Sequence, residues 1–546
     1  MNRKKSAWVA LVLALSLALS ACGGAKSPDP GQNPSGGQTA KKSLTIGMWS
    51  APSTLNPLTY TTTYEQTIIS LIYPRLLVMD QDLNFVGQLA DRWEPNETYD
   101  KFTFHIHNDA KWSDGTPITS EDVLYTIGAI AHPKTPTTRR SMIDTIVGLD
   151  DNGVDQNADF VIEGFNIVDD KTFEISTKTP VNPDTFFEKL GANVYIQPKK
   201  VLSTVTDWLN VDKQPWALKP EITGGAYNFV KYQTGSYVEL APNKDYWLGA
   251  PALDSLFVKV VAQGSFAAAI EAGEIDISGG AGVGEVPITD WEKVSKLPNV
   301  VPATYTAPSY QYLDINVLRP EFQDVRVRQA LAYAINRELI VSRLLDGEGE
   351  VLNTPINSAN KYYLPELQKM YPYDPEKAKQ LLAEAGWDPN TEVVILTPTG
   401  NIVREQSADI IMANLQDVGI KAKVEKVDFP TRQARAQAGD FQLSLVGFSA
   451  TFDPDFSGQV ATGAGFNYSG YSSPKMDELL TTGKTTADFE AKKAVYTEAQ
   501  QLFAEDLPFI PLYAPKALTV VNKRAKNVVL GPQGLTWNAH EWDVNQ

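Results

Sequence analysis

The fold class is decided by residues 393–424, which read VVILTPTGNIVREQSADIIMANLQDVGIKAKV. The apolar run Val393–Leu396 is typical of a short buried strand, and residues 420–424 alternate as a second strand. Between them, residues 403–417 have the pattern of a helix, and Gly419 supplies its stop. A strand, a helix and a strand over so few residues predict a right-handed βαβ unit on a parallel sheet, and hence an α/β protein.

Open α/β sheets bind their ligands at the carboxyl ends of their strands. The sequence offers two such ends in this region. One is Thr397–Gly400, and the other is the end of a predicted strand, residues 441–448, which runs into Ser449–Asp455. We therefore expect ligand contacts at both places.

The length and composition set the class of protein. A chain of 546 residues exceeds what one hydrophobic core usually supports, so two or more lobes are expected. Asp and Glu number 65 against 48 Lys and Arg, which gives a formal net charge of -17. Nucleic-acid binding needs clusters of basic residues, and we find none, so no nucleic-acid partner is expected.

The N-terminus has the layout of a secretory signal. Arg3–Lys5 are basic, residues 7–19 are apolar but too few to span a membrane, and Leu19–Cys22 reads LSAC. This motif resembles the bacterial lipobox, in which the chain is cut just before the cysteine and the sulfur is acylated. The likeness implies a signal peptide at 1–21 and a lipid on Cys22, the only cysteine of the chain. The alternative is an ordinary signal with an incidental cysteine.

A polar tether is expected next, over residues 22–42. Residues 23–42 contain five Gly, three Pro and no large apolar residue, so they cannot bury enough surface to fold.

A second informative stretch runs from Tyr73 to Tyr125. Phe102, Phe104 and Ile106 alternate with polar residues, which predicts a half-buried strand. A turn at 114–117 follows, and Thr119 or Ser120 then caps a predicted helix.

The wording of this stretch resembles that of the extracellular solute-binding proteins of the peptide and nickel class, family 5, which are the receptors of ABC importers. The likeness continues at intervals to the C-terminus. The segments that carry it are Pro74–Leu77, Leu89–Trp93, Phe102–Ile106, Trp112–Thr119, Glu121–Val123, Asn243–Trp247, Val325–Leu331 and Asn467–Tyr471.

The resemblance implies a two-lobed periplasmic-binding-protein-like fold of the class II type, with an extra domain and mixed sheets flanked by helices. It divides the mature chain into three parts. Lobe I is expected at 43–72, 190–305 and 517–546, domain II at 73–189, and lobe III at 306–516.

An enzyme would need catalytic groups, and the sequence lacks the usual sets. HExxH, Gly-x-Ser-x-Gly and cysteine–histidine pairs are missing. His105 and His107 could bind a metal from one face of a strand, but the same spacing suits any exposed strand. We therefore expect a binding protein with no catalytic residues, no metal and no cofactor, and keep a secreted hydrolase as the alternative.

Two segments are expected to contact the ligand. The resemblance places the segment of Thr61 and Thr63 on one side of a peptide and Gly447, Phe448 and Ser449 on the other. Peptide backbone is most generally held by adding it as a strand, with its side chains in roomy pockets.

Relatives that read a peptide's free amine place an aspartate after Gly-Trp-x-Ala, where this chain has Thr451. The nearby Asp453-Pro454-Asp455 offers carboxylates instead. We predict that Asp453 pairs with the ligand's α-ammonium, with Asp455 as the second candidate. The alternative is that Asp453 shapes the Asp-Pro turn.

The resulting prediction is a monomeric receptor, anchored by lipid on the outer face of the cell membrane, that delivers oligopeptides to an ABC transporter permease. The same fold with another cargo, such as a nickel chelate, a glycan or a signalling peptide, is the nearest alternative.

Overall fold

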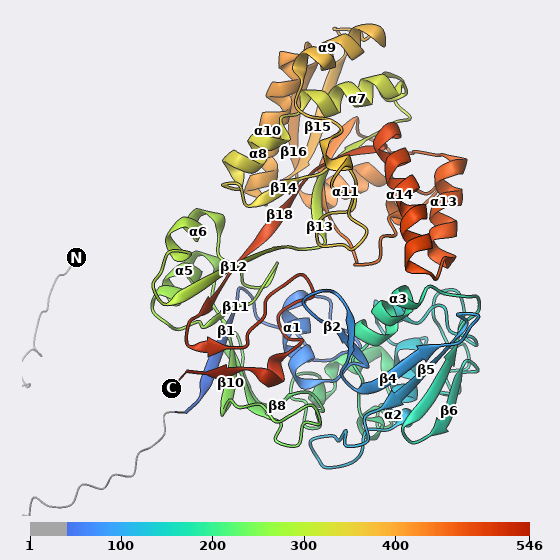
Figure 1. Ribbon diagram of the computed structural model, residues 1–546, viewed down its shortest axis with the longest axis vertical. Helices are drawn as coiled ribbons and strands as arrows, with labels where there is room; N and C mark the ends of the chain where they lie inside the picture. The colour runs from blue at the N-terminus through green and yellow to red at the C-terminus, as the bar shows by residue number, and fades with distance from the viewer. Residues whose placement is uncertain (1–40, 546) are drawn as a thin grey trace, which may run out of the picture. The chain divides into compact units, whose positions relative to one another are not determined.

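The computed structural model describes residues 41–545 (Figure 1). The predicted signal peptide, Cys22 and all but the last two residues of the predicted tether lie outside them. Within the described range, no helix combines the length and the apolar character that a membrane span requires.

One large mixed sheet runs through the described residues. Its strands follow the order β16-β15-β17-β13-β18-β11-β1-β10-β9-β8, and β12 and β14 pair with β18 beside this path. The twelve strands are β1 (Ser43–Met48), β8 (Tyr227–Gln233), β9 (Tyr237–Pro242), β10 (Ser255–Val260), β11 (Ile277–Ser278), β12 (Val300–Thr306), β13 (Ser309–Ile315), β14 (Gly349–Val351), β15 (Glu392–Pro398), β16 (Lys421–Val427), β17 (Leu443–Ser449) and β18 (Phe509–Asn522).

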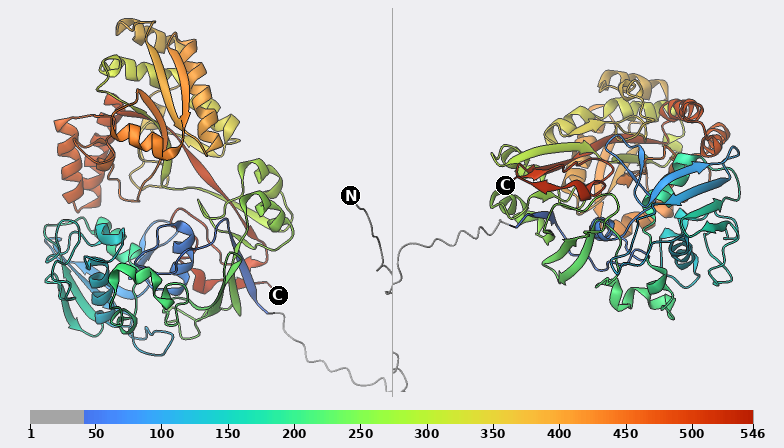
Figure 2. Two further views of the ribbon diagram at one scale, coloured as in Figure 1. Left: turned by 180° about the vertical axis from the view of Figure 1, so that it is seen from behind. Right: turned by 60° about the horizontal axis from the view of Figure 1, so that its bottom comes forward.

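The long strand β18 joins the two ends of this sheet. Its first half pairs with β13, where Tyr513 lies opposite Gln311. Its second half pairs with β12, where Leu518 lies opposite Thr304. In Figures 1 and 2, β18 passes from the upper part of the molecule to the lower part. We keep the names lobe I, domain II and lobe III for the residue ranges that the family resemblance implies. The chain also crosses between the two parts from β12 to β13, so a few extended residues connect them.

Lobe III contains the βαβ unit that the sequence predicts. β15 and β16 are parallel neighbours, with Val393 opposite Ala422. The helix between them begins after Asn401, whose side chain accepts the Arg404 N–H, and Gly419 follows its end with a φ of +89°. The α/β prediction is thus confirmed. The helices of lobe III are α7 (Val325–Ala334), α8 (Arg337–Leu344), α9 (Pro375–Glu384), α10 (Ile402–Asp417), α11 (Phe429–Gln437), α12 (Ser457–Val460), α13 (Pro474–Thr485) and α14 (Phe489–Asp506).

The strand predicted at 441–448 is β17, and it begins two residues later than expected. Phe441 is buried in a small cluster with Leu396 and Ala436. The side chain of Gln442 accepts the Val394 N–H at 2.8 Å. Both side chains therefore contact residues of β15 just before β17 begins.

Domain II is built on a four-stranded antiparallel sheet in the order β4-β5-β7-β6. The predicted alternation is confirmed in β5, where Phe102, Phe104 and Ile106 are buried and the residues between them are partly exposed. The elements of domain II are β2 (Leu77–Met79), β3 (Phe85–Gly87), β4 (Ala90–Pro95), β5 (Lys101–Ile106), α2 (Ser120–Ala131), β6 (Phe165–Asp169), β7 (Thr172–Ser176) and α3 (Pro183–Phe186). The π-helical turn η2 (Phe187–Ala192) crosses the expected boundary between residues 189 and 190.

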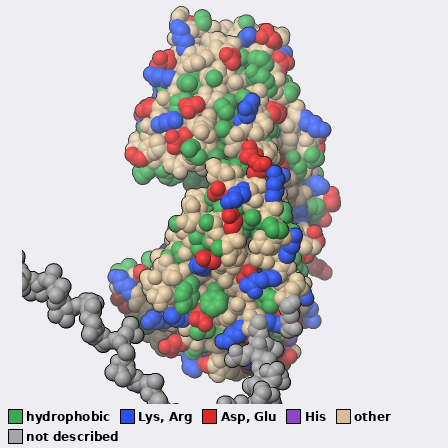
Figure 3. All heavy atoms as spheres, turned by 90° about the vertical axis from the view of Figure 1, so that its left-hand side faces the viewer, with side chains coloured by type: hydrophobic (Ala, Val, Ile, Leu, Met, Phe, Trp, Pro, Cys, Tyr) green, Lys and Arg blue, Asp and Glu red, His purple; other side chains and the backbone are tan. Residues whose placement is uncertain are grey.

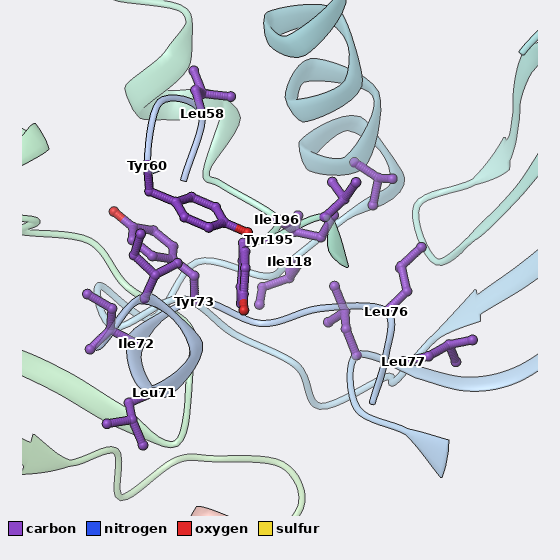
Figure 4. Close-up of a cluster of buried hydrophobic side chains, with 14 of the residues drawn as sticks. Leu58, Tyr60, Leu71, Ile72, Tyr73, Leu76, Leu77, Ile118, Tyr195 and Ile196 are labelled. Carbon is purple, nitrogen blue, oxygen red and sulfur yellow. The ribbon is translucent and has the colours of Figure 1, made fainter. Parts of the chain in front are cut away.

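Lobe I and domain II share one hydrophobic core. In Figure 4 the rings of Tyr60, Tyr73 and Tyr195 lie together beside Ile118, with Leu76 and Leu77 farther along the same core. The rings of Tyr60 and Tyr195 meet edge to face with their centroids 5.9 Å apart. Because these side chains come from the segments that flank α1, from the start of domain II and from the segment after η2, the core joins both ends of α1 to the segment after η2. The helices and short strands of lobe I are α1 (Thr63–Ile72), α4 (Lys199–Leu202), α5 (Gln263–Glu271), α6 (Ile288–Val294), β19 (Ala525–Lys526) and β20 (Asp543–Val544).

Candidate functional site

A cavity of about 680 Å³ lies between lobe III and the other two parts of the chain. Figure 3 shows a hollow between the upper and lower parts on one side of the molecule. The main lining segments are Thr63–Ser70 of α1, the glycine loop Gly279–Val283, the turn Ala307–Ser309, the segment Ser449–Phe452 and the C-terminal loop Pro532–Trp537. The segment of Thr61 and Thr63 and the end of β17 therefore both reach one cavity. No residue of Thr397–Gly400, the other strand end at which ligand contacts are expected, is among its lining residues.

Thr63 lines this cavity, whereas Thr61 does not. The Thr61 N–H donates to the Glu65 carboxylate at 2.9 Å, and the Thr62 N–H donates to the same oxygen at 3.0 Å. Glu65 is buried, and together with Thr62 it forms the capping box that begins α1. Thr61 thus helps to fix the start of the helix, and Thr63 is the residue of this pair that a ligand can reach.

Of the three residues predicted at the end of β17, Ser449 lines the main cavity. Phe448 lies in a smaller neighbouring pocket and packs against Tyr310, with ring centroids 6.0 Å apart. A Cβ atom at Gly447 would lie 2.5 Å from the Gln311 amide and 3.0 Å from the Arg404 guanidinium. Gly447 therefore leaves room for two side chains of the protein.

The Asp453 carboxylate is engaged with groups of the protein itself. Its Oδ2 lies 2.8 Å from Lys492 Nζ and accepts the Thr185 hydroxyl, and its Oδ1 accepts the Asp455 N–H at 2.9 Å. The Asp455 carboxylate accepts the Ser457 N–H and lies 3.4 Å from Lys484. The bond to Asp455 N–H is the one that the Asp-Pro turn interpretation requires.

Glu188, at the start of η2, connects domain II to lobe III. Its two carboxylate oxygens accept the N–H groups of Phe452 and Asp453 at 3.0 and 2.9 Å. Glu188 is 8% exposed. Burial raises the pKa of its carboxyl group to about 7; the two N–H groups and Lys492 lower this pKa, and Asp453 raises it further.

Besides the turn Ala307–Ser309, two main lining segments were not predicted from sequence as ligand contacts. The glycine run Gly279–Gly284 reads as a plain loop, but it follows β11 and its residues Gly279–Val283 line the cavity. The rule that ligands gather at strand ends could have found it. The second segment is the C-terminal loop, in which the Gln533 amide and the Trp537 indole N–H are buried with no hydrogen-bond partner in the described residues. No local pattern marks that loop in the sequence.

The two histidines of β5 and its following turn are held apart by different neighbours. His105 Nε2 lies 2.7 Å from Arg92, and His107 Nδ1 accepts the Asp109 N–H. Among residues 41–545, no group of three or more His, Cys, Asp or Glu side chains is arranged to hold a metal ion.

Residues 84–469 match the family model described as bacterial extracellular solute-binding proteins, family 5 Middle. The chain is 28% identical to the oligopeptide-binding protein AppA of Bacillus subtilis over 99% of both proteins. It is 27% identical to the periplasmic oligopeptide-binding protein OppA of Salmonella typhimurium over 93% of both.

Two solved structures have the same fold. The structure of Bacillus subtilis AppA in complex with a nonapeptide superposes with a TM-score of 0.71 at 26% identity, covering 92% of this chain and 99% of that one. The substrate-binding protein CtaP of Listeria monocytogenes gives a TM-score of 0.80 at 24% identity, over 92% and 99% of the two chains. The family match covers more than half of the chain, and this chain therefore belongs to the bacterial extracellular solute-binding proteins of family 5.

Proposed function

We propose that this chain captures oligopeptides in the cavity between lobe III and the lower part of the molecule and delivers them to the permease of an ABC importer. Ligand that contacts both walls binds the closed arrangement more tightly than an open one, and so favours closure. The extended crossings at β12–β13 and in β18 are the segments that would bend.

The observation that carries this proposal is the chemistry of the cavity wall. Among its described lining residues, Glu188 is the only acid and Arg75 the only base. Most of the wall consists of small or uncharged polar residues and of glycine-rich backbone. Such a wall suits a ligand that presents amide groups and side chains of varied kind, because few fixed charges select against any side chain. A peptide has this chemistry.

The relatives support the choice of cargo. AppA and OppA are named as oligopeptide-binding proteins, and the AppA structure holds a nonapeptide. We extend this cargo to the present chain, which spans nearly the full length of both relatives. Thr63 on one wall and Ser449 on the other are the proposed contacts from the two predicted segments.

The N-terminal motif supports a proposal about where the protein acts. We propose that Cys22 carries the lipid that anchors a monomeric receptor to the outer face of the membrane, with residues 22–42 as the tether. This proposal rests on the LSAC motif at Leu19–Cys22 and on the extracellular role of the family.

The test is to purify the protein, release what it carries and determine the masses of the released molecules. We then expect a defined peptide pool to bind, with every peptide recovered uncleaved, and small-angle scattering to record a smaller radius of gyration with peptide. Cleavage products would instead support a hydrolase, and binding of a metal chelate or glycan in place of peptides would refute the proposed cargo.

A further inference from the structure

Three charged side chains meet where domain II contacts lobe III. They are Glu188 on η2, Asp453 after β17 and Lys492 on α14. The Lys492 ammonium lies 2.8 Å from Asp453 Oδ2 and 3.2 Å from both Asn182 Oδ1 and Thr185 Oγ1. A lysine has three N–H donors, so these three acceptors use all of them. Figure 1 shows α3, which carries Thr185, below α13 and α14.

The cluster contains two carboxyl groups, Glu188 and Asp453, and only one cation, Lys492. Lys492 is paired with Asp453, and Glu188 has two backbone N–H donors but no cation within ion-pair distance among the described residues. The ionisable groups around it are Asp453 and Lys492, together with Asp184 and Lys361 in a neighbouring cavity. Arg75, on the main cavity wall, donates to the Ala192 carbonyl and lies over the Tyr195 ring. A buried carboxylate without a cation is costly, and it stays neutral or recruits a cation.

Glu188 lies at the junction of two cavities. It lines the main cavity and also a side cavity of about 280 Å³, and the two share Met79, Glu188 and Phe452 in their walls. The side cavity is of mixed character, because Asn84, Asp184, Lys361, Asp453 and Lys492 line it together with apolar residues. Its apolar lining residues are Met79, Leu83, Phe85, Trp93, Phe187, Tyr362, Phe452 and Pro454.

We propose that Glu188 is the counter-ion for the terminal ammonium group of the bound peptide, and that the side cavity takes the apolar or aromatic side chain of the peptide's first residue. This inference rests on the proposed function and names the group that the same site reads. Each Glu188 oxygen spends one acceptor position on a backbone N–H, and a carboxylate has about four, so positions remain for an ammonium group. Asp453 needs no ligand cation, because Lys492 already supplies one.

Proton linkage gives this pairing a signature. With the Glu188 pKa raised to about 7 in the free protein, the carboxyl group is mostly protonated at pH 6. An ammonium group binds its ionised form, so binding at pH 6 releases close to one proton. Affinity for a free-amine peptide then rises as pH increases toward 7, and falls again where the peptide's amine loses its own proton, near pH 8.

The competing role for Glu188 is purely structural. In that case the carboxylate only joins η2 to the backbone of Phe452 and Asp453, and its loss weakens every ligand to the same extent. An N-acetylated peptide separates the two roles, because it keeps the side chains and backbone of the free peptide and lacks the ammonium group.

The experiment is calorimetry on the full-length receptor, purified free of bound lipid and other ligand. The titrant is one peptide that begins with phenylalanine, used in its free and its N-acetylated form. Buffers of different ionisation enthalpy count the protons released. The variants are Glu188→Gln and, as a control with the same change of charge, Glu174→Gln on β7, whose carboxylate pairs with Lys101 away from both cavities.

We expect Glu188→Gln to weaken the free peptide at least about 30-fold and the acetylated one less than about threefold, and to abolish proton release. Glu174→Gln should match the wild type. Equal weakening of both peptides by Glu188→Gln would overturn the assignment. A wild type that binds both peptides equally well and releases no proton would also overturn it, and this second outcome does not depend on the folding of the variant. Failure of both forms to bind the wild type would instead refute the proposed cargo.

Discussion

The ammonium group of Lys492 and the carboxylate of Asp453 lie 2.8 Å apart, and their side chains are 1% and 12% exposed. Asn182 and Thr185 of domain II share the same ammonium group with this lobe III aspartate. Asn182 also donates to the carbonyls of Thr486 and Ala487, between α13 and α14. One buried cation is therefore bound from both sides of the contact between domain II and lobe III.

Removal of this cation should destabilise the protein strongly. Lys492→Met leaves Asp453 buried without its partner, and we expect a loss of about 3–5 kcal/mol in the free energy of unfolding. Lys475→Met is the control, because Lys475 and its partner Glu498 are 53% and 55% exposed and such a pair contributes about 1 kcal/mol at most. Urea unfolding of both variants measures the two losses of stability. Similar losses would contradict a large contribution of the buried Lys492–Asp453 pair.

The stability of the free protein should depend on Glu188 between about pH 5 and 7. The pKa of Glu188 is raised from 4.5 to about 7 in the folded chain, so the folded state holds a proton that the unfolded state loses. This contribution is fully present below pH 4.5 and is lost as pH rises through 7. Burial also raises the pKa of Asp314 to about 7, so Asp314 adds a pH dependence of stability with the same sign.

Denaturant unfolding at several pH values tests this expectation. Between pH 5 and 7 the wild type should lose more stability than Glu188→Gln, because Asp314 contributes equally to both proteins and cancels in the difference. Parallel pH profiles for the two proteins would mean that Glu188 titrates normally.

The glycine loop should tolerate no side chain where it meets β1. A Cβ atom at Gly284 would lie 2.1 Å from the Gly47 carbonyl oxygen. Gly284→Ala must therefore displace the loop that lines the cavity, and we expect about tenfold weaker peptide binding and a stability loss of about 1–3 kcal/mol. Gly264→Ala on α5 is the control, since nothing lies within 4 Å of a Cβ atom there. Calorimetry that finds both variants equal to the wild type would contradict the close approach.

Cys22 should decide where the protein is found. Two or more acyl chains hold a protein stably on a membrane, whereas one chain gives only marginal binding. Replacement of Cys22 with Ala should move the protein from the membrane fraction to the soluble fraction. Fractionation followed by immunoblotting checks this, and a variant that still sediments with membranes would refute lipid anchoring.

The sequence predicted those parts of the fold that depend on local pattern. Apolar spacing, a cap and a glycine stop predict the βαβ unit of β15, α10 and β16, and alternation predicts β5. The structure contains both as expected. The rule about strand ends pointed to Ser449, which lines the cavity, and equally to Thr397–Gly400, which does not, because topology alone does not say which strand end faces the other lobe.

Pairings between distant residues could not be predicted in the same way. Asp453 and Lys492 are 39 positions apart, and Glu188 reaches backbone 264 positions away. Glu188 sits in the segment Phe186–Ala192, where Lys189 is the one other charged residue and no motif marks Glu188 as a ligand contact. Only the packing of η2 against lobe III brings its carboxylate to the cavity.

Filling the cavity tests most directly whether peptides bind there. Ser449→Trp places a large side chain on the cavity wall, and Thr234→Trp places the same side chain in the exposed turn between β8 and β9. Calorimetry with the same peptide pool should show binding for the wild type and Thr234→Trp, and at least tenfold weaker binding for Ser449→Trp with an unchanged far-UV circular dichroism spectrum. Undiminished binding by folded Ser449→Trp would contradict the claim that peptides bind in this cavity.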